Sequence, residues 1–213
     1  MGQFGFLGFL TMSGGGWVIY LLIAFSIVAV AVIIERLVVV NRVFAYQESA
    51  LMAVTERLGV GTGELLKGLK KDSILYRVAN ELVEHSNSGT VSLERHLESR
   101  LALERRGLEK RVIVLGTLGN NAPFVGLLGT VLGVIRAFHD LGASAGQGPE
   151  VVMQGISEAL VATAVGILVA LPCVAAFNYI KKRIKDILVD ADRFGHQLIA
   201  VLLLSKQGRR AGD

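Results

Sequence analysis

Three long stretches of this sequence lack any charged residue. They are residues 17–34, 112–135 and 159–180, which contain 18, 24 and 22 residues. A helix needs about 17–25 predominantly apolar residues to cross a bilayer, so each stretch is long enough. The chain of 213 residues is 52% hydrophobic and only 19% charged, which departs from the average of soluble proteins. We therefore predict an all-α integral membrane protein with three spanning helices.

Basic residues are missing from the start of the chain. Residues 1–16 contain no Lys or Arg, so the positive n-region of a secretory signal peptide is absent. Arg36 and Arg42 follow the first apolar run, as expected of a retained membrane helix. The chain also has a single cysteine, Cys173, which cannot form an internal disulfide. We interpret it as a small apolar packing residue.

Enzyme signatures are absent as well. The sequence has no nucleophile elbow, P-loop, HExxH motif or paired cysteines, and Gly126–Thr130 lies within a spanning stretch without a following lysine. We therefore expect no enzyme and no cofactor. We also expect no metal site, because four scattered histidines show no metal-ligand spacing: His85, His96, His139 and His196.

The 22 Lys and Arg residues predict the orientation. Thirteen lie from Arg36 to Arg111 and eight from Lys181 onward, whereas residues 139–150 have none and Arg136 alone lies on that side. Positive residues stay on the cytoplasmic side, so we expect an outside N-terminus and a cytoplasmic C-terminus. Topology thus explains the pI of about 9.4 without nucleic-acid binding. The basic run 181–185 suits anionic lipid headgroups instead.

These patterns divide the chain into seven segments. The first, third, fifth and seventh lie outside the membrane, and the second, fourth and sixth are the spanning helices. In order they are an external N-terminus 1–16, a span 17–40, a cytoplasmic helical segment 41–111, a span 112–138, an external loop 139–150, a span 151–180 and a cytoplasmic C-terminal helix and tail 181–213.

Apolar periodicity predicts helices in the cytoplasmic segments. We expect a helical continuation of the first span to residue 58, a glycine break at 59–63, a short helix 64–69 and a helix 73–85. A long rod should begin near residue 92, capped by Thr90 or Ser92, and run unbroken into the second span. Its leucine stripe is Leu93, Leu97, Leu101 and Leu108, and the C-terminal helix presents Ile184, Ile187, Leu188, Ala191, Phe194 and Leu198.

Small residues recur in the second and third spans. Gly129 and Gly133 fall four residues apart in one span, and Ala162 and Gly166 do so in the other. Small residues at this spacing let helices approach closely in membranes. The first span carries bulky side chains instead. We expect the first span to face lipid and the other two to face protein.

One carboxylate, Glu158, begins the row of small residues in the third span. An ionisable group in a membrane helix costs roughly 2.5–3.5 kcal/mol at mid-membrane and usually faces a bundle interior or an ion path. Counting back from Lys181 places Glu158 near the outer end of the apolar core. Its carboxyl group can be neutral in an apolar site, as a proton relay requires.

Thr130, Thr163 and Asn121 allow two interpretations. They could be hydrogen-bonding glue between helices, worth on average about 0.6 kcal/mol each in membranes, or polar lining of an ion path beside Glu158. Glu158 and Thr163 lie five residues apart, about 140° around a helix, so both cannot point at one axis.

At these residues the chain resembles the MotA/TolQ/ExbB proton channel family, and especially its ExbB/TolQ branch. The resemblance is carried by residues 121–135, 155–166 and the pair Leu171–Pro172. It implies three spans in the bacterial inner membrane, with the external side being the periplasm. It also implies a homopentamer whose pore holds two copies of a single-span partner similar to ExbD or TolR.

The resemblance further assigns roles. Glu158 matches the family's glutamate, Thr130 and Thr163 match its pore threonines, and Gly129, Gly133, Ala162 and Gly166 pack beside the path. Proton flow would then drive rotation that energises TonB-dependent import, the Tol-Pal system or gliding motility. The short N-terminus is closer to TolQ, whereas the sequence does not distinguish these tasks or protons from sodium.

A different hypothesis is a passive oligomeric scaffold in which polar span residues serve only helix packing. A substrate transporter is less well supported, because three spans without a pair of discontinuous helices make a poor carrier alone.

Overall fold

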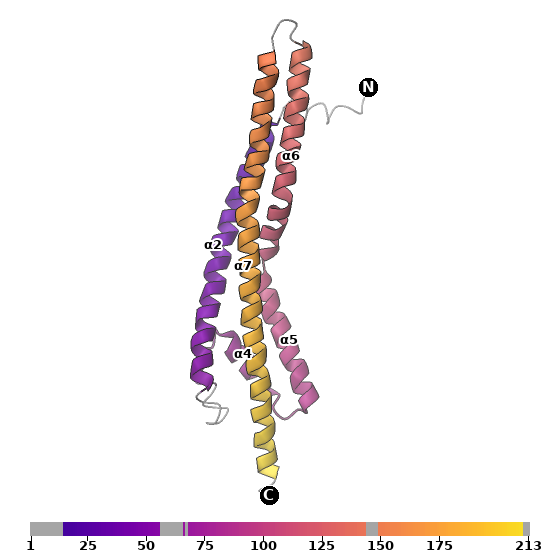
Figure 1. Ribbon diagram of the computed structural model, residues 1–213. Helices are drawn as coiled ribbons and strands as arrows, with labels where there is room; N and C mark the ends of the chain where they lie inside the picture. Colours follow the sequence, from indigo (N-terminus) through magenta and orange to yellow (C-terminus); the bar gives the residue numbers. More distant parts are fainter. Residues whose placement is uncertain (1–14, 56–65, 67, 144–148, 211–213) are drawn as a thin grey trace. The chain divides into compact units, whose positions relative to one another are not determined.

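A computed structural model describes residues 15–55, 66, 68–143 and 149–210. The described residues form helices joined by short turns, with no strand among them, which confirms the all-α prediction for this part of the chain. The helices, coloured along the chain in Figure 1, are α2 (Gly16–Thr55), α4 (Ile74–Glu84), α5 (Thr90–Glu109), α6 (Val112–Ala143) and α7 (Pro149–Arg210).

Three of these helices are long and apolar enough to span a membrane. They are α2, α6 and α7, and their most apolar windows have mean hydropathies of 2.9, 1.5 and 2.5. A helix satisfies all of its backbone hydrogen bonds internally, as the interior of a bilayer demands. The predicted three-span architecture is therefore confirmed at the level of helix number, length and composition.

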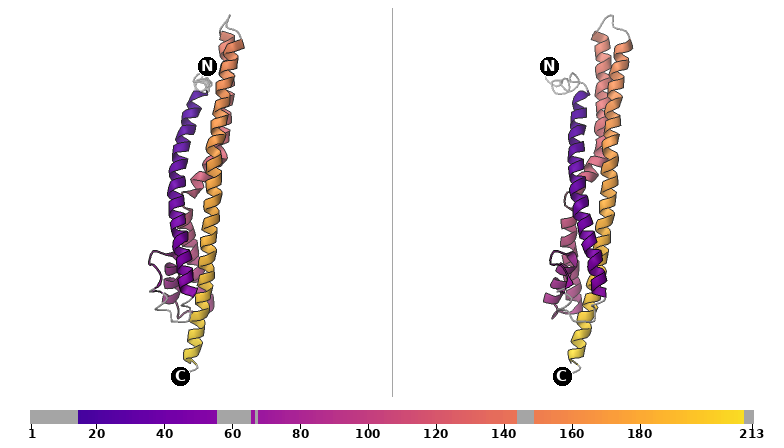
Figure 2. Two further views of the ribbon diagram at one scale, coloured as in Figure 1. Left: turned by 60° about the vertical axis from the view of Figure 1, so that its left-hand side comes forward. Right: turned by 90° about the vertical axis from the view of Figure 1, so that its left-hand side faces the viewer.

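The chain divides into two compact units. The first, here called the membrane unit, contains residues 1–35 and 111–178, and the second, the bundle unit, contains residues 36–110 and 179–213. In the membrane unit, α6 and the first part of α7 run antiparallel as a hairpin beside the first part of α2 (Figure 2). The fully buried Val18, Leu22, Ala122 and Cys173 form the centre of its core.

The outer side of α2 in the membrane unit is bulky and exposed. Tyr20, Ile27 and Ile34 expose 76%, 66% and 59% of their surface, while Val18 and Leu22 are buried against α6 and α7. An apolar surface of this kind suits lipid, so one face of α2 fits the expectation for the first span. Its opposite face packs against protein.

The expected unbroken rod from residue 92 into the second span was wrong. Helix α5 ends at Glu109, and α6 begins at Val112 after a break at Lys110 and Arg111. Arg111 has a φ of 65°, a left-handed conformation that a non-glycine residue rarely adopts and that ends a helix. Its guanidinium donates to both carboxylate oxygens of Glu35, at 2.8 and 2.7 Å. Sequence periodicity continues across this break, so it gave no warning.

The third span and the C-terminal helix form one continuous helix of 62 residues. Helix α6 extends to Ala143 and α7 begins at Pro149, so both helices continue into the segment 139–150. Helix α2 continues through residue 55, as predicted for its extension, and α4 closely matches the expected helix 73–85. The expected break at 59–63 and half of the expected helix 64–69 lie outside the described residues, and residues 66 and 68 are helical.

The bundle unit packs the rest of α2 and α7 with α4 and α5. Ser73 caps α4 by accepting a hydrogen bond from the Tyr76 backbone at 3.1 Å, whereas α5 begins at Thr90 after Gly89 without a side-chain cap. Neither Thr90 nor Ser92 therefore caps α5 as expected. The apolar faces predicted for the rod and the C-terminal helix are largely confirmed, with these residues buried: Leu93, Leu97, Leu108, Ile184, Ile187, Ala191, Phe194 and Leu198. On α4, Ile74, Val78 and Leu82 are buried as well.

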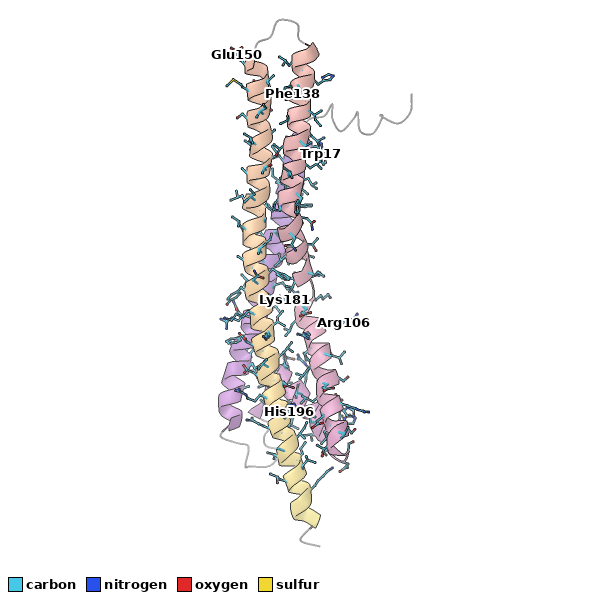
Figure 3. The ribbon with its side chains drawn as sticks, turned by 45° about the vertical axis from the view of Figure 1, so that its right-hand side comes forward. Trp17, Arg106, Phe138, Glu150, Lys181 and His196 are labelled. Carbon is cyan, nitrogen blue, oxygen red and sulfur yellow. The ribbon has the colours of Figure 1, made fainter. Side chains whose placement is uncertain are left out.

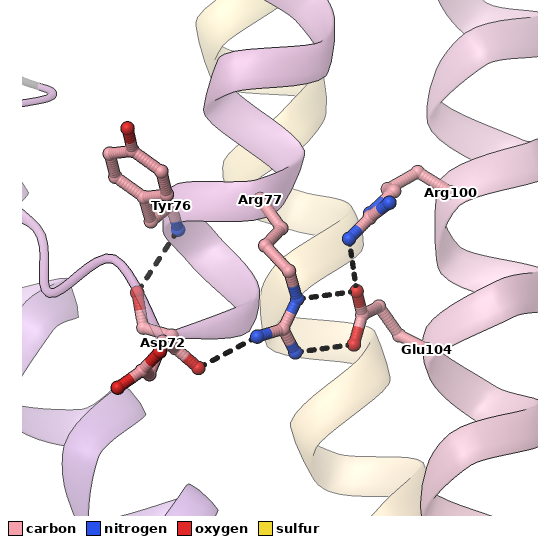
Figure 4. Close-up of polar contacts among 6 residues, drawn as sticks. Asp72, Tyr76, Arg77, Arg100 and Glu104 are labelled. Carbon is pink, nitrogen blue, oxygen red and sulfur yellow. Dashed lines mark hydrogen bonds and ion pairs between the residues drawn. The ribbon is translucent and has the colours of Figure 1, made fainter.

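Glu104 of α5 ties the two short helices together (Figure 4). It accepts two hydrogen bonds from the Arg77 guanidinium of α4, at 2.7 and 2.6 Å, and lies 2.8 Å from Arg100. Only 11% of the Glu104 side chain is exposed. The hydrogen bond with Glu104 is the main cause that raises the pKa of Arg77 above its ordinary value, against the effect of burial. The charged form of Arg77 is thus favoured in a partly buried site.

Candidate functional site

Helices α6 and α7 of the membrane unit touch through their small residues. A β-carbon added to Gly129 would lie 2.7 Å from the Ala162 Cβ, and one on Gly133 would lie 2.6 Å from the Ala159 Cβ. Real β-carbons essentially never come so close, so only glycine fits at these two positions without a shift of the neighbouring helix.

The same close approach continues along the hairpin in both directions. A β-carbon on Gly166 would lie 2.7 Å from the Ala122 carbonyl oxygen, and one on Gly155 would lie 2.6 Å from the Ala137 Cβ. Gly15, just before α2, approaches the Gly129 carbonyl oxygen to a comparable degree. The row of glycines and alanines thus spans most of the α6–α7 contact, with the start of α2 against it.

Thr130 and Thr163 form a hydrogen bond across this helix contact. The Thr130 hydroxyl also lies 3.2 Å from the Gly126 carbonyl oxygen of its own helix. Both bonds are made when Thr163 donates to Thr130 and Thr130 donates to the carbonyl. The pair is half-buried, and it lies beside the Gly129–Ala162 contact. Two residues chosen from the sequence 33 positions apart are therefore brought together.

Two other polar residues of α6, Thr117 and Asn121, bond to their own helix. The Thr117 hydroxyl donates to the Ile113 carbonyl at 3.0 Å, and the Asn121 amide donates to the Thr117 carbonyl at 2.7 Å. Both side chains are exposed on the chain. Pro123 follows them and lacks a backbone donor, so the carbonyl that loses its usual helical partner is that of Gly119, and these two side-chain bonds go to other carbonyls. In the single chain Asn121 bonds to its own helix, and the interpretation as interhelical glue stays a prediction.

Glu158 lies in an open pocket at the loop end of the hairpin. The pocket has a volume of about 560 Å³. Figure 3 marks this end with Phe138 of α6 and Glu150 of α7. The Glu158 carboxylate accepts a hydrogen bond from the Gln154 amide, one turn earlier on α7, at 3.4 Å. The pocket is lined by Gly15, Gly16, Ile19, Gly129, Gly133, Arg136, Ala137, Asp140, Gln154, Gly155, Glu158, Ala159, Val161 and Ala162.

Sequence reasoning missed three polar companions of Glu158. Arg136, Asp140 and Gln154 line the same pocket, and the Arg136 Nε lies 3.5 Å from an Asp140 carboxylate oxygen. Arg136 was noted only as an exception to the charge rule. Its proximity follows from the antiparallel hairpin, in which residues before the loop meet those an equal distance after it. This pairing of residues across the α6–α7 hairpin is the feature from which the proximity of Arg136 to Glu158 could have been predicted.

The Glu158 side chain is exposed in the single chain, and so are those of its apolar neighbours. Leu160 and Val161 expose 59% and 50% of their surface, and Met153 exposes 69%. A carboxylate on such a face would meet lipid if the chain were alone in a membrane, at a cost below the roughly 2.5–3.5 kcal/mol of the midplane because Glu158 lies near the outer end of the apolar core. Water or another protein surface removes that cost.

Glu158 and the threonine pair occupy different levels of the hairpin. Five residues of helix separate Glu158 from Thr163, which corresponds to about 7.5 Å along the axis. A single hydrogen bond is too short to join them. Transfer of a proton between these groups would need at least one water or a polar group from another chain.

The fold and this site define a class: a multi-pass membrane protein whose polar groups lie on an apolar helical hairpin. The chain belongs to the MotA/TolQ/ExbB proton channel family, which matches residues 67–193. The matched region contains the whole hairpin, including Thr130, Glu158 and Thr163. Members of this family are channel proteins rather than enzymes.

Similar proteins come from both the ExbB and the TolQ groups. The chain is 38% identical over 106 residues to the biopolymer transport protein ExbB of Xanthomonas campestris, which covers 50% of this chain and 42% of that protein. It is 38% identical over 97 residues to an ExbB-like biopolymer transport protein of Helicobacter pylori, covering 44% and 65%. It is 30% identical over 203 residues to the Tol-Pal system protein TolQ of Haemophilus influenzae, covering 87% of each.

The matches to the ExbB proteins and to TolQ differ in extent. The aligned stretch is less than two thirds of the length of the Xanthomonas and Helicobacter proteins, but nearly all of the Haemophilus TolQ. Local identity is higher with ExbB, whereas overall extent is greater with TolQ. The chain therefore belongs to the ExbB/TolQ type without a preference between the two systems.

Proposed function

We propose that this chain is the proton-channel, stator-type subunit of an inner-membrane motor that uses the proton motive force. It would work with a single-span partner similar to ExbD or TolR, and it would energise an envelope process of the TonB, Tol-Pal or gliding type. Support for the channel class comes from family membership and from homologues in the biopolymer transport and Tol-Pal systems.

The observation that carries the proposal is the position of Glu158. Its carboxylate is exposed on a largely apolar hairpin and lies in a pocket with Arg136 and Asp140. Lipid is a poor environment for this surface, so the assembled protein must place water or another protein segment against it. A chain that exposes a carboxylate at membrane depth in this way suits a proton path shared between subunits.

Thr130 and Thr163 would extend the path along the hairpin. Their hydroxyls are already linked across the two helices, and a chain of hydroxyl groups can accept and donate protons in turn. Because Glu158 is one level away, we propose that water bridges the two sites. The small residues Gly129, Gly133, Ala162 and Gly166 would hold the helices close enough for this arrangement.

We also propose the assembly and its orientation. The N-terminus would face the periplasm and the C-terminus the cytoplasm, following the charge asymmetry. Five copies would surround a pore that holds two partner helices, as the resemblance implies. At the cytoplasmic membrane edge Lys182 and Lys185, both exposed, would face anionic headgroups, whereas Lys181 is bound to Glu109 at 2.9 Å.

Proton flux through the purified complex tests the proposal. The chain would be co-expressed with a single-span partner similar to ExbD or TolR, isolated from membranes and reconstituted into liposomes containing a pH-sensitive dye. We expect an imposed proton gradient to drive flux that depends on the partner, and an imposed sodium gradient to drive none. A passive scaffold would show no flux above that of empty liposomes.

Variants separate the scaffold hypothesis from the channel. Under the scaffold hypothesis, Glu158→Gln lowers the stability of the complex in detergent. Under the proposed function, it leaves the complex intact and removes the proton flux. The two outcomes are read from the same preparation, by size-exclusion chromatography and by the dye signal.

A further inference from the structure

Two histidines and a glutamate meet between α4 and α5 of the bundle unit, away from the hairpin site. Glu81 and His85 lie one turn apart near the end of α4, and His96 lies on α5, which contacts α4. The two helices are labelled in Figure 1. The four histidines are scattered along the sequence, but the turn between α4 and α5 brings residues 85 and 96 together.

The donor atoms of the three side chains converge. The His96 Nδ1 lies 3.1 Å from the Glu81 Oε1, and the His85 Nδ1 lies 3.6 Å from the same oxygen. One ligand atom from each residue lies within 4.8 Å of the other two. The side chains of Glu81, His85 and His96 are 29%, 39% and 33% exposed, so the cluster is accessible from solvent.

We propose that Glu81, His85 and His96 form a binding site for a divalent transition-metal ion of the Zn²⁺ class. Imidazole nitrogen and carboxylate oxygen are ordinary Zn²⁺ ligands, and bonds of about 2.0–2.1 Å place neighbouring ligands of a tetrahedral ion about 3.3 Å apart. The two measured distances lie on either side of that value. Three protein ligands leave a fourth position for water.

Without a metal ion, hydrogen bonds from the two histidines hold the cluster together. The His96 Nδ1 donates to the Glu81 carboxylate, and the His85 Nδ1 donates to the Glu81 backbone carbonyl at 2.9 Å. A metal ion takes the place of these protons, and each neutral imidazole then carries its hydrogen on Nε2. The three ligands are thus assembled before the ion arrives.

Loading requires a small rearrangement of the rings. The imidazoles of His85 and His96 are stacked, with centroids 3.7 Å apart and planes inclined by 23°. A metal ion binds in the plane of each imidazole, so the rings must turn out of the stack when both ligate it. The ion would then link the end of α4 to α5 across the turn, which makes the α4–α5 pair more resistant to opening.

His196 provides a matched control on α7. Its Nε2 lies 3.6 Å from the Asp192 carboxylate, again one turn apart, but its ring is 57% exposed. Among the described residues, this pair has no third ligand that would complete a metal-binding group. It therefore reproduces the one-turn spacing of carboxylate and histidine found in the site, without the convergence of three donors.

Metal titration of the full chain tests the site. The chain is purified in detergent without a polyhistidine tag, and Zn²⁺ affinity is measured by competition with a chromophoric chelator. Co²⁺ serves as a second probe, because four-coordinate Co²⁺ has strong visible ligand-field bands. We expect one Zn²⁺ site per chain and an intense Co²⁺ spectrum. Glu81→Gln and His96→Ala should each weaken Zn²⁺ binding at least about tenfold.

The controls keep the result decisive. His196→Ala should bind Zn²⁺ as the unmodified chain does, and circular dichroism should show each variant to be helical. Glu81→Gln preserves the shape of the side chain, so it remains informative if His96→Ala does not fold. Wild-type affinity in Glu81→Gln or in a His85→Ala/His96→Ala double variant would overturn the proposal, as would loss of binding in His196→Ala. The outcome is independent of proton flux, so it is separate from the proposed function.

Discussion

The hydroxyl of Thr130 on α6 is hydrogen-bonded to the hydroxyl of Thr163 on α7. This bond joins the two membrane helices at the level where Gly129 and Ala162 touch, and it adds a polar link to a contact made otherwise of small apolar groups. The threonine pair has two interpretations: it either only holds the helices together or lines a proton path. The two interpretations predict different results when the hydrogen bond is removed.

Thr163→Val removes the hydroxyl and keeps the shape of the side chain. If the bond were only glue, the change would cost on average about 0.6 kcal/mol of stability and leave proton flux intact. The proposed path predicts that flux in proteoliposomes is abolished while the complex still assembles. Thr163→Ser should retain flux, and Thr117→Val on the exposed side of α6 is the matched control. Wild-type proton flux in Thr163→Val would show that the Thr130–Thr163 pair serves only helix packing.

Gly133→Ala tests the close approach of α6 and α7. Replacing glycine in an open helix position usually stabilises by about 0.5–1 kcal/mol. Here the new Cβ would lie 2.6 Å from the Ala159 Cβ, so overpacking of about 1–3 kcal/mol should reverse the sign. Thermal unfolding in detergent measures the effect. Gly142→Ala, with open space around its Cβ, is the control and should be neutral or stabilising. Equal behaviour of both variants would contradict the contact.

The helix break at Arg111 predicts that glycine is tolerated better than alanine at this position. Both Arg111→Gly and Arg111→Ala lose the ion pair with Glu35, but only alanine retains the strain of a φ of 65°. The alanine variant should therefore be less stable than the glycine variant by about 1–2 kcal/mol. Chemical unfolding of the two variants provides the comparison. Equal stabilities would show that α5 and α6 do not break at this residue.

Glu104 is expected to be the most sensitive charged residue of the bundle unit. Glu104→Gln leaves the guanidinium groups of Arg77 and Arg100 facing a neutral amide, which should cost about 1–3 kcal/mol. Glu98→Gln, on the exposed side of α5, should change stability by no more than about 0.5 kcal/mol. Urea titration of the two variants distinguishes them, and a neutral Glu104→Gln would mean that the network contributes nothing.

The same network predicts how stability responds to pH. The pKa of Arg77 is raised by Glu104 in the folded chain. The contribution of Arg77 to the free energy of unfolding is therefore fully present at any pH below its ordinary pKa, which is already basic. This contribution is lost only as the pH rises through the still higher pKa of Arg77 in the folded chain. Unfolding free energies measured from neutral to mildly alkaline pH should therefore show the same difference between Arg77→Gln and the unmodified chain. A difference that shrinks across this range would contradict the assignment.

The sequence predicted the spanning helices well because their signal is local. An uninterrupted apolar run must be a helix in a membrane, and small residues four apart mark its contact face, as Gly129 and Gly133 illustrate. The pairing of Thr130 with Thr163 was open from sequence, since it depends on the hairpin register. The break at Arg111 was missed because a single residue in a left-handed conformation leaves no trace in periodicity.

Clusters formed across a turn were also beyond local patterns. His85 and His96 lie on different helices, and their stacking depends on how α4 and α5 pack. Arg136 and Asp140 join the Glu158 pocket for the same reason, because α6 and α7 fold back on each other. In each case the residue types were visible in the sequence, whereas their proximity required the tertiary arrangement.

The most direct test is proton flux through complexes that carry Glu158→Gln. Glutamine keeps the size of the side chain and the hydrogen bond with Gln154, but it cannot take up or release a proton at physiological pH. Glu150→Gln, at the exposed start of α7, is the matched control. The account predicts an assembled complex without flux for Glu158→Gln and normal flux for Glu150→Gln. Normal flux through Glu158→Gln would contradict it.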